Sequence, residues 1–159
     1  MPRRAPLEAQ MYSHLGPSRF SALGFLGEDA RDFEDILADD ARTLDRLGVS
    51  REQLVQELRE IYERALKAGG DPVRAGTASI AECLECRGRV PSPFPGEGTF
   101  AKHQVRVFRE DGAETLVITP LALHLIERHG FFQGIGSPFR IDPAQAVSVL
   151  GLGAKRKNG

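Results

Sequence analysis

The sequence contains little that would tie the chain to a membrane or to an oxidising compartment. It has no tryptophan, only two cysteines in 159 residues, and no apolar run near the roughly 20 residues that a membrane-spanning helix needs. The first six residues lack the apolar core of a secretory signal. Two cysteines are also too few for a disulfide framework. We therefore expect a cytoplasmic protein with no membrane segment.

A strong charge of either sign is absent as well. Lysine and arginine number 21 against 22 aspartates and glutamates, which leaves a formal net charge of −1. Such a balance gives no long-range attraction to a phosphate backbone, so nucleic-acid binding is disfavoured and a protein partner is expected. The basic residues at 155–157 add only a weak, salt-sensitive attraction at the end of the chain.

The composition is that of an ordinary globular protein, with 41% hydrophobic and 27% charged residues. A chain of this length can bury a core of its own as one domain. Prolines and glycines interrupt any period over residues 1–20, which predicts an irregular arm. We expect a single α+β domain over 21–152, without an internal repeat or a second core, and a flexible basic tail over 153–159.

Two amphipathic helices are predicted in the first half. Apolar residues recur at helical spacing over 28–47, and Gly48 stands where a left-handed cap would end that helix. Ser50 and Gln53 then form the pattern of a capping box, which starts a second helix that runs to the glycines at 69–70. The short link between the helices favours an antiparallel pair.

The second half changes to an extended pattern. Alternating apolar residues, with Asp111–Gly112 as a turn, predict a hairpin, and Thr119 and Asp142 each precede a proline as helix caps do. The predicted elements are strands over 78–85, 100–108 and 115–118, a proline-rich loop over 88–99, and short helices over 120–129 and 143–150. The expected fold class is α+β: an N-terminal antiparallel helix pair packed on a small, mainly antiparallel sheet, with two short C-terminal helices.

Cys83, Cys86, His124 and His129 have the residue types and local spacings of a zinc site. A Cys-x2-Cys turn and a pair of histidines near a helix end commonly supply four tetrahedral ligands. Two features oppose this hypothesis: 37 residues separate the two halves, and five residues on a helix turn two side chains about 140° apart. The alternatives are two cysteines on opposite faces of a strand, a redox pair, and histidines that serve as a core group and a helix cap.

A glycine-rich segment over 129–140 is a second candidate site. Gly134 and Gly136 could turn backbone amides toward an anion, with further donors from Arg128, Ser137 and Arg140. The segment lacks the ending of a phosphate-binding loop. The alternative is a loop pinned by its three phenylalanines, whose rings would mark a partner surface if they stayed exposed.

The sequence does not decide whether the protein is an enzyme. It contains no nucleophile motif such as Gly-x-Ser-x-Gly. The leading hypothesis is a small intracellular binding or accessory protein with a structural zinc ion. The alternative is a small metal-dependent hydrolase or phosphate-handling enzyme, with His124 and His129 as ligands or base and Arg140 as an anion clamp. The partner, the substrate, the strand order and the oligomeric state cannot be predicted.

Overall fold

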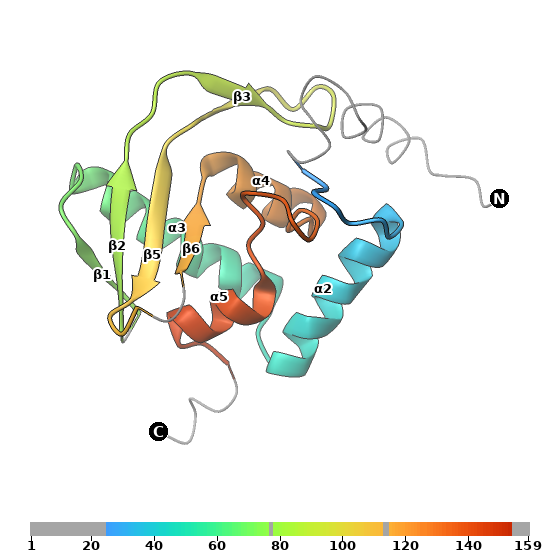
Figure 1. Ribbon diagram of the computed structural model, residues 1–159, viewed down its shortest axis with the longest axis horizontal. Helices are drawn as coiled ribbons and strands as arrows, with labels where there is room; N and C mark the ends of the chain where they lie inside the picture. The colour runs from blue at the N-terminus through green and yellow to red at the C-terminus, as the bar shows by residue number, and fades with distance from the viewer. Residues whose placement is uncertain (1–24, 77, 113–114, 154–159) are drawn as a thin grey trace.

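The computed structural model describes residues 25–76, 78–112 and 115–153. Within these ranges the chain has the predicted α+β architecture, with four helices, a four-stranded antiparallel sheet and a small two-stranded sheet (Figure 1). The predicted arm over 1–20, and all but the first residue of the predicted tail over 153–159, lie outside the described residues.

The main sheet has one buried face. Its strands stand in the order β1-β2-β5-β6: β1 (Val73–Ala75), β2 (Ser79–Leu84), β5 (Gln104–Arg109) and β6 (Thr115–Ile118). In the register, Ala81 pairs with Val107, which pairs with Leu116 on its other side. These three side chains are buried, whereas their neighbours along each strand are more exposed. The alternation is that of a sheet covered on one side.

The helices cover this face and each other (Figure 1). They are α2 (Phe33–Leu47), α3 (Arg51–Lys67), α4 (Pro120–His129) and α5 (Pro143–Leu150). Helix α3 packs on the sheet and on α4, whereas α2 packs mainly on α5. The buried hydroxyl of Ser79 donates to the carbonyl of Val149 at 2.7 Å and so fixes α5 to β2. Helix α2 therefore joins the fold mainly through α5.

The predicted helix caps are confirmed. The side chains of Ser50, Thr119 and Asp142 each accept one hydrogen bond from the backbone amide of the residue three positions later in the sequence. The first helix begins at Phe33 rather than near residue 28. The preceding turn instead pairs with the glycine-rich segment, since the amide of Glu28 donates to the carbonyl of Ile135 at 3.1 Å.

The proline-rich stretch forms a hairpin where an irregular loop was predicted. Strands β3 (Arg89–Pro91) and β4 (Thr99–Ala101) pair with each other and with no other strand of the described residues. Pro91 is tolerated because it stands at the end of an edge strand. This β3–β4 hairpin, residues 89–101, contacts α4 through β4, and β3 lies beyond the end of the main sheet in Figure 1.

The buried apolar side chains of the described residues form two clusters. The larger lies between the sheet, α3 and α5. The smaller joins the hairpin to α2, α4 and the glycine-rich segment, and its buried members are Phe25, Phe33, Ile36, Phe94, Leu121, Leu125 and Phe131. Phe94, at the tip of the hairpin, is only 1% exposed. Because these residues come from distant segments, no local periodicity announces them.

Asp29 is predicted to contribute to stability in a pH-dependent way. Its buried carboxylate accepts two hydrogen bonds from the Arg31 guanidinium, and these lower its pKa to about 2 from 3.8. The folded pKa lies below the unfolded one, so the stabilisation is present above pH 3.8 and is lost as the pH falls toward 2. Asp29→Asn should therefore lower the free energy of unfolding by about 2 kcal/mol at pH 7.

Urea denaturation at neutral pH and near pH 2 measures this difference. The gap between wild type and Asp29→Asn should close at the lower pH, while Asp71→Asn, at an exposed position, should match wild type at both. Equal stability of wild type and Asp29→Asn at neutral pH would contradict the prediction.

Candidate metal site

Helix α4 and the β3–β4 hairpin bring two histidines to one carboxylate. Nε2 of His124 lies 2.6 Å from Oε1 of Glu97, and Nε2 of His129 lies 2.8 Å from Oε2. Each oxygen of the carboxylate thus meets one imidazole. The three side chains can present ligand atoms within 4.8 Å of one another, which makes them a candidate metal-binding cluster.

The two histidines reach this point although the helix turns them apart. Five residues on an α-helix separate side chains by about 140° beyond a full turn, and the planes of the two rings lie 84° apart. The tip of the hairpin places Glu97 between the two imidazoles, so that one carboxylate contacts both. His129 is the last residue of α4, and Gly130 follows with φ +66°, which ends the helix at the site.

Neighbouring side chains hold the three groups in position. The hydroxyl of Ser92 donates to Oε1 of Glu97 at 2.8 Å. Phe94 stacks on His129 with 3.7 Å between ring centroids, and the ring of Phe100 lies 4.7 Å from that of the other histidine. Such outer contacts fix the orientation of ligands in metal sites.

The electrostatics of Glu97 and His129 favour the protonation states that bind metals. Burial raises the pKa of the Glu97 carboxyl, but the hydrogen bonds from His124, Ser92 and His129 outweigh burial and hold that pKa below its usual value. Burial lowers the pKa of His129, and the contact of this histidine with Glu97 offsets only part of that lowering. An ionised carboxylate and a neutral imidazole are the forms that coordinate a metal ion.

The donor set suits zinc. Two imidazole nitrogens and a carboxylate oxygen are ligands that Zn²⁺ accepts, at about 2.0 to 2.2 Å each. Tetrahedral bonds of that length separate ligand atoms by about 3.3 Å, against 2.6 and 2.8 Å between the hydrogen-bonded atoms here. Each imidazole nitrogen would have to move away from the carboxylate by roughly 0.5 to 0.7 Å to accommodate the ion.

The two cysteines do not join this cluster. Cys83 is buried on β2 beside Val105, and burial raises the pKa of its thiol. Cys86 lies beyond the end of β2, where its amide donates to Nδ1 of His103 at 3.0 Å. Among the described residues, the group that could hold a metal contains neither thiol. The geometry therefore keeps the histidine half of the predicted set and replaces the cysteine half with Glu97, because β2 carries Cys83 into the sheet.

Arg140, the predicted anion clamp, has its guanidinium engaged with other groups. It donates two hydrogen bonds to the carboxylate of Asp40, at 2.9 and 2.8 Å, and one to the carbonyl of Gln133 at 2.6 Å. Asp142 lies 3.3 Å away, and only 11% of the arginine side chain is exposed. These contacts occupy donors that an anion would need, so they support the interpretation of this segment as a packed loop.

The other residues of the predicted anion loop have separate structural roles. Gly134 packs so tightly that a Cβ there would overlap the carbonyl oxygen of Leu26. A Cβ at Gly136 would lie 3.2 Å from the backbone nitrogen of Glu28, which is a tight contact without overlap. The hydroxyl of Ser137 donates to Oε1 of Gln133 at 2.7 Å. Arg128 does not join the predicted anion loop either, since its Nε lies 3.8 Å from the carboxylate of Glu97, at the candidate metal cluster.

Glu97 is the site residue that sequence reasoning missed. The available signal was an acidic residue flanked by Gly96 and Gly98 inside a proline-rich stretch. Both glycines have positive φ, at +84° and +83°, as a tight turn requires. A side chain held on such a turn is displayed at its tip, which is a common place for functional groups.

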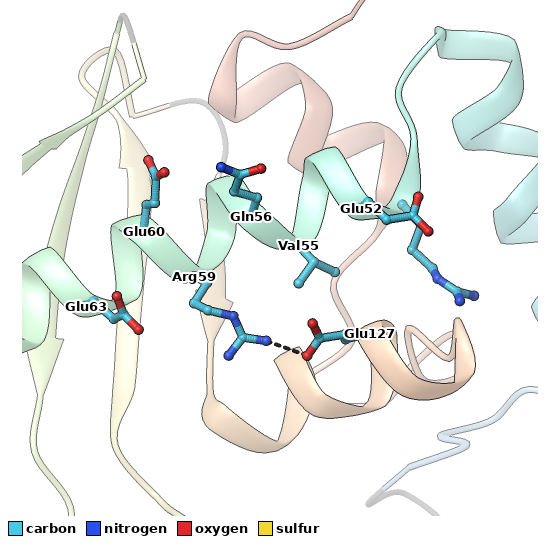
Figure 2. Close-up of a pocket in the computed structure, with 8 residues that line it drawn as sticks. Glu52, Val55, Gln56, Arg59, Glu60, Glu63 and Glu127 are labelled. Carbon is cyan, nitrogen blue, oxygen red and sulfur yellow. Dashed lines mark hydrogen bonds and ion pairs between the residues drawn. The ribbon is translucent and has the colours of Figure 1, made fainter.

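A shallow depression lies between α3 and α4, and none of the three cluster residues lines it. Figure 2 shows Arg59 reaching from α3 to Glu127 on α4, at 2.6 Å, while other glutamates line α3. This depression has a volume of about 250 Å³ and is lined by Arg51, Glu52, Val55, Gln56, Arg59, Glu60, Glu63 and Glu127. A second depression of about 230 Å³ shares three of these residues and extends to His124. A small molecule could approach the cluster from this side.

No family model, curated protein or solved structure matches this chain. Within the described ranges, no helix combines the length and the apolar character required to cross a bilayer. The chemistry of the site is therefore inferred from its own geometry.

Proposed function

We propose that this protein binds one zinc ion through Glu97, His124 and His129 and acts as a binding or accessory protein. The observation that carries the proposal is a single carboxylate held between two imidazole nitrogens. A metal ion at this point would fasten the β3–β4 hairpin to α4. The hairpin would then present a fixed surface to a partner.

A hydrogen-bonded cluster without a metal is the simpler interpretation of the same distances. Three observations favour a metal: the donor set matches zinc, the carboxylate has a further hydrogen bond from Ser92, and both imidazoles are packed against phenylalanine rings. The two interpretations differ in their response to added zinc, which makes them separable by experiment.

A protein partner in the cytoplasm fits the surface and the cysteines. Leu84, Ile135 and Phe139 are large apolar side chains with exposed fractions of 61%, 57% and 37%. Exposed apolar side chains at contact surfaces contribute to protein association. The chain has only two cysteines, Cys83 and Cys86, which are too few for a disulfide framework, and this supports a reducing compartment.

The decisive measurement is the zinc content and zinc affinity of the full chain. Wild type should bind about one equivalent, and Glu97→Gln should lower the affinity at least about tenfold, because the amide cannot supply the charged ligand. His103→Asn serves as the matched control, since that histidine lies outside the cluster. Zinc binding that is absent from wild type, or unchanged in Glu97→Gln, would overturn the proposal.

A metal-dependent hydrolase is a second candidate, and the number of ligands favours it. Catalytic zinc sites keep three protein ligands and leave another position to water, whereas structural sites are closed by four. The depression beside His124 offers an approach to that position. Zinc-dependent hydrolysis of a nitrophenyl ester or phosphate, lost in Glu97→Gln, would favour the enzyme. A zinc-loaded protein inert toward both would favour the accessory role.

A further inference from the structure

A separate cavity lies between the β3–β4 hairpin, the start of α4 and the glycine-rich segment. Its volume is about 380 Å³, within the range of small-molecule pockets. Most of its wall is apolar, with contributions from Phe25, Val90, Leu121, Pro138 and Phe139. None of the three metal-site residues lines it. This cavity is therefore independent of the candidate zinc site.

Gln133 places a buried amide in the wall of this cavity. It is 3% exposed and has φ +73°, the only positive φ outside glycine among the described residues. Backbone strain of this kind is characteristic of ligand sites. Its Oε1 accepts from Ser137 and its carbonyl from Arg140. The Nε2 group has two donors, and it is not one of the fully buried atoms that lack a partner, so it is accessible from the cavity that Gln133 lines.

The charge in the cavity wall is positive. Among the described residues that line the cavity, Lys102 is the one with a charged side chain. Gln133, which is 3% exposed, and Lys102, which is exposed, both line this apolar cavity, and together they suit a ligand with an anionic acceptor at one end. A carboxylate meets this requirement, because it accepts hydrogen bonds and carries negative charge.

We propose that this cavity binds a small monocarboxylate with an apolar tail. The carboxylate lies between the Gln133 amide and the Lys102 ammonium. The tail packs against Phe25, Leu121 and Phe139.

Calorimetric titration of the full chain with hexanoate, octanoate and decanoate tests the ligand class. Affinity should rise about fourfold for each added methylene until the cavity is full. Octylamine, which has the same tail as octanoate and the opposite charge, should bind at least about tenfold more weakly. Absence of saturable binding by every carboxylate, or equal affinity for octylamine and octanoate, would refute the proposal.

Two variants test the head-group contacts. Gln133→Glu keeps the shape of the side chain but replaces the donor with an acceptor, and should weaken octanoate binding at least about tenfold. Because a buried charge can destabilise the fold, Lys102→Met, at an exposed position, provides a second test and should weaken binding several-fold. Lys67→Met, an exposed lysine outside the cavity, is the matched control. Wild-type affinity in both Lys102→Met and a folded Gln133→Glu would refute the assignment.

Cys86 gives an independent readout of where the ligand binds. Cys86 is among the residues that line the cavity, whereas Cys83 is buried in the core. Saturating octanoate should slow the alkylation of Cys86 by iodoacetamide, with the modified residue identified by mass spectrometry. An unchanged rate at saturation would place the carboxylate elsewhere and contradict the proposal.

Discussion

Arg140→Met is expected to destabilise the fold by about 3 to 5 kcal/mol, measured by chemical denaturation. The guanidinium forms a bidentate pair with Asp40, whose residue is 4% exposed, and it also holds the carbonyl of Gln133. Burial lowers the pKa of Arg140, but its hydrogen bonds and the charges of Asp40 and Asp142 outweigh burial and raise it above its usual value. Removal of the arginine leaves a buried carboxylate without its counter-ion, which costs more than the loss of the pair itself.

A double substitution separates these two costs. Asp40→Asn combined with Arg140→Met removes both charges, and should recover a substantial part of the stability that Arg140→Met alone loses. Arg42→Met is the control, because that arginine is exposed and its ion pair is with Asp39 at the surface. A loss below about 1 kcal/mol in Arg140→Met, the level of a surface pair, would contradict the buried-pair account.

Zinc should raise the free energy of unfolding by about 4 kcal/mol when its free concentration is a thousand times the dissociation constant. The unfolded chain lacks the arrangement of Glu97, His124 and His129, so the ion binds mainly to the folded state. A thermal unfolding series with increasing zinc measures the effect. Hydrogen exchange should show added protection over the hairpin, residues 89–101, and over the end of α4.

The same series in Glu97→Gln provides the test of mechanism. The midpoint should then be nearly independent of zinc, whereas Cys86→Ser should behave as wild type, since Cys86 is outside the cluster. An increase in stability that is equal in wild type and Glu97→Gln would mean that zinc binds at another place.

The local signals in the sequence predicted much of the fold correctly. The caps at Ser50, Thr119 and Asp142 start helices at the expected residues, and the strand over 115–118 has the predicted bounds. These features depend on hydrogen bonds between residues a few positions apart, so the sequence contains the whole interaction. The predicted start of α2 was too early because Glu28 and Asp29 both form hydrogen bonds with the distant residue Ile135. The carboxylate of Asp29 also accepts from the nearby Arg31.

The hairpin and the site depend on contacts between distant segments. Prolines at 91, 93 and 95 predict irregular structure locally, yet burial of Phe94 in the smaller cluster stabilises a paired hairpin there. That burial is what places Glu97 beside α4. Spacing alone favoured the cysteines as ligands, since their proximity in sequence resembles a zinc knuckle.

The sequence by itself determined the α+β class, the ends of most helices, and the presence of two histidines on α4. Each of these follows from short-range periodicity and capping. Only the tertiary structure decided that the third member of the cluster is Glu97, that Arg140 is paired with Asp40, and that Gln133 faces a cavity. Glu97 is 27 residues from His124, and Asp40 is 100 residues from Arg140. Gln133 is 108 residues from Phe25, which lines the same cavity. The burial that joins these residues has no local signature in the chain.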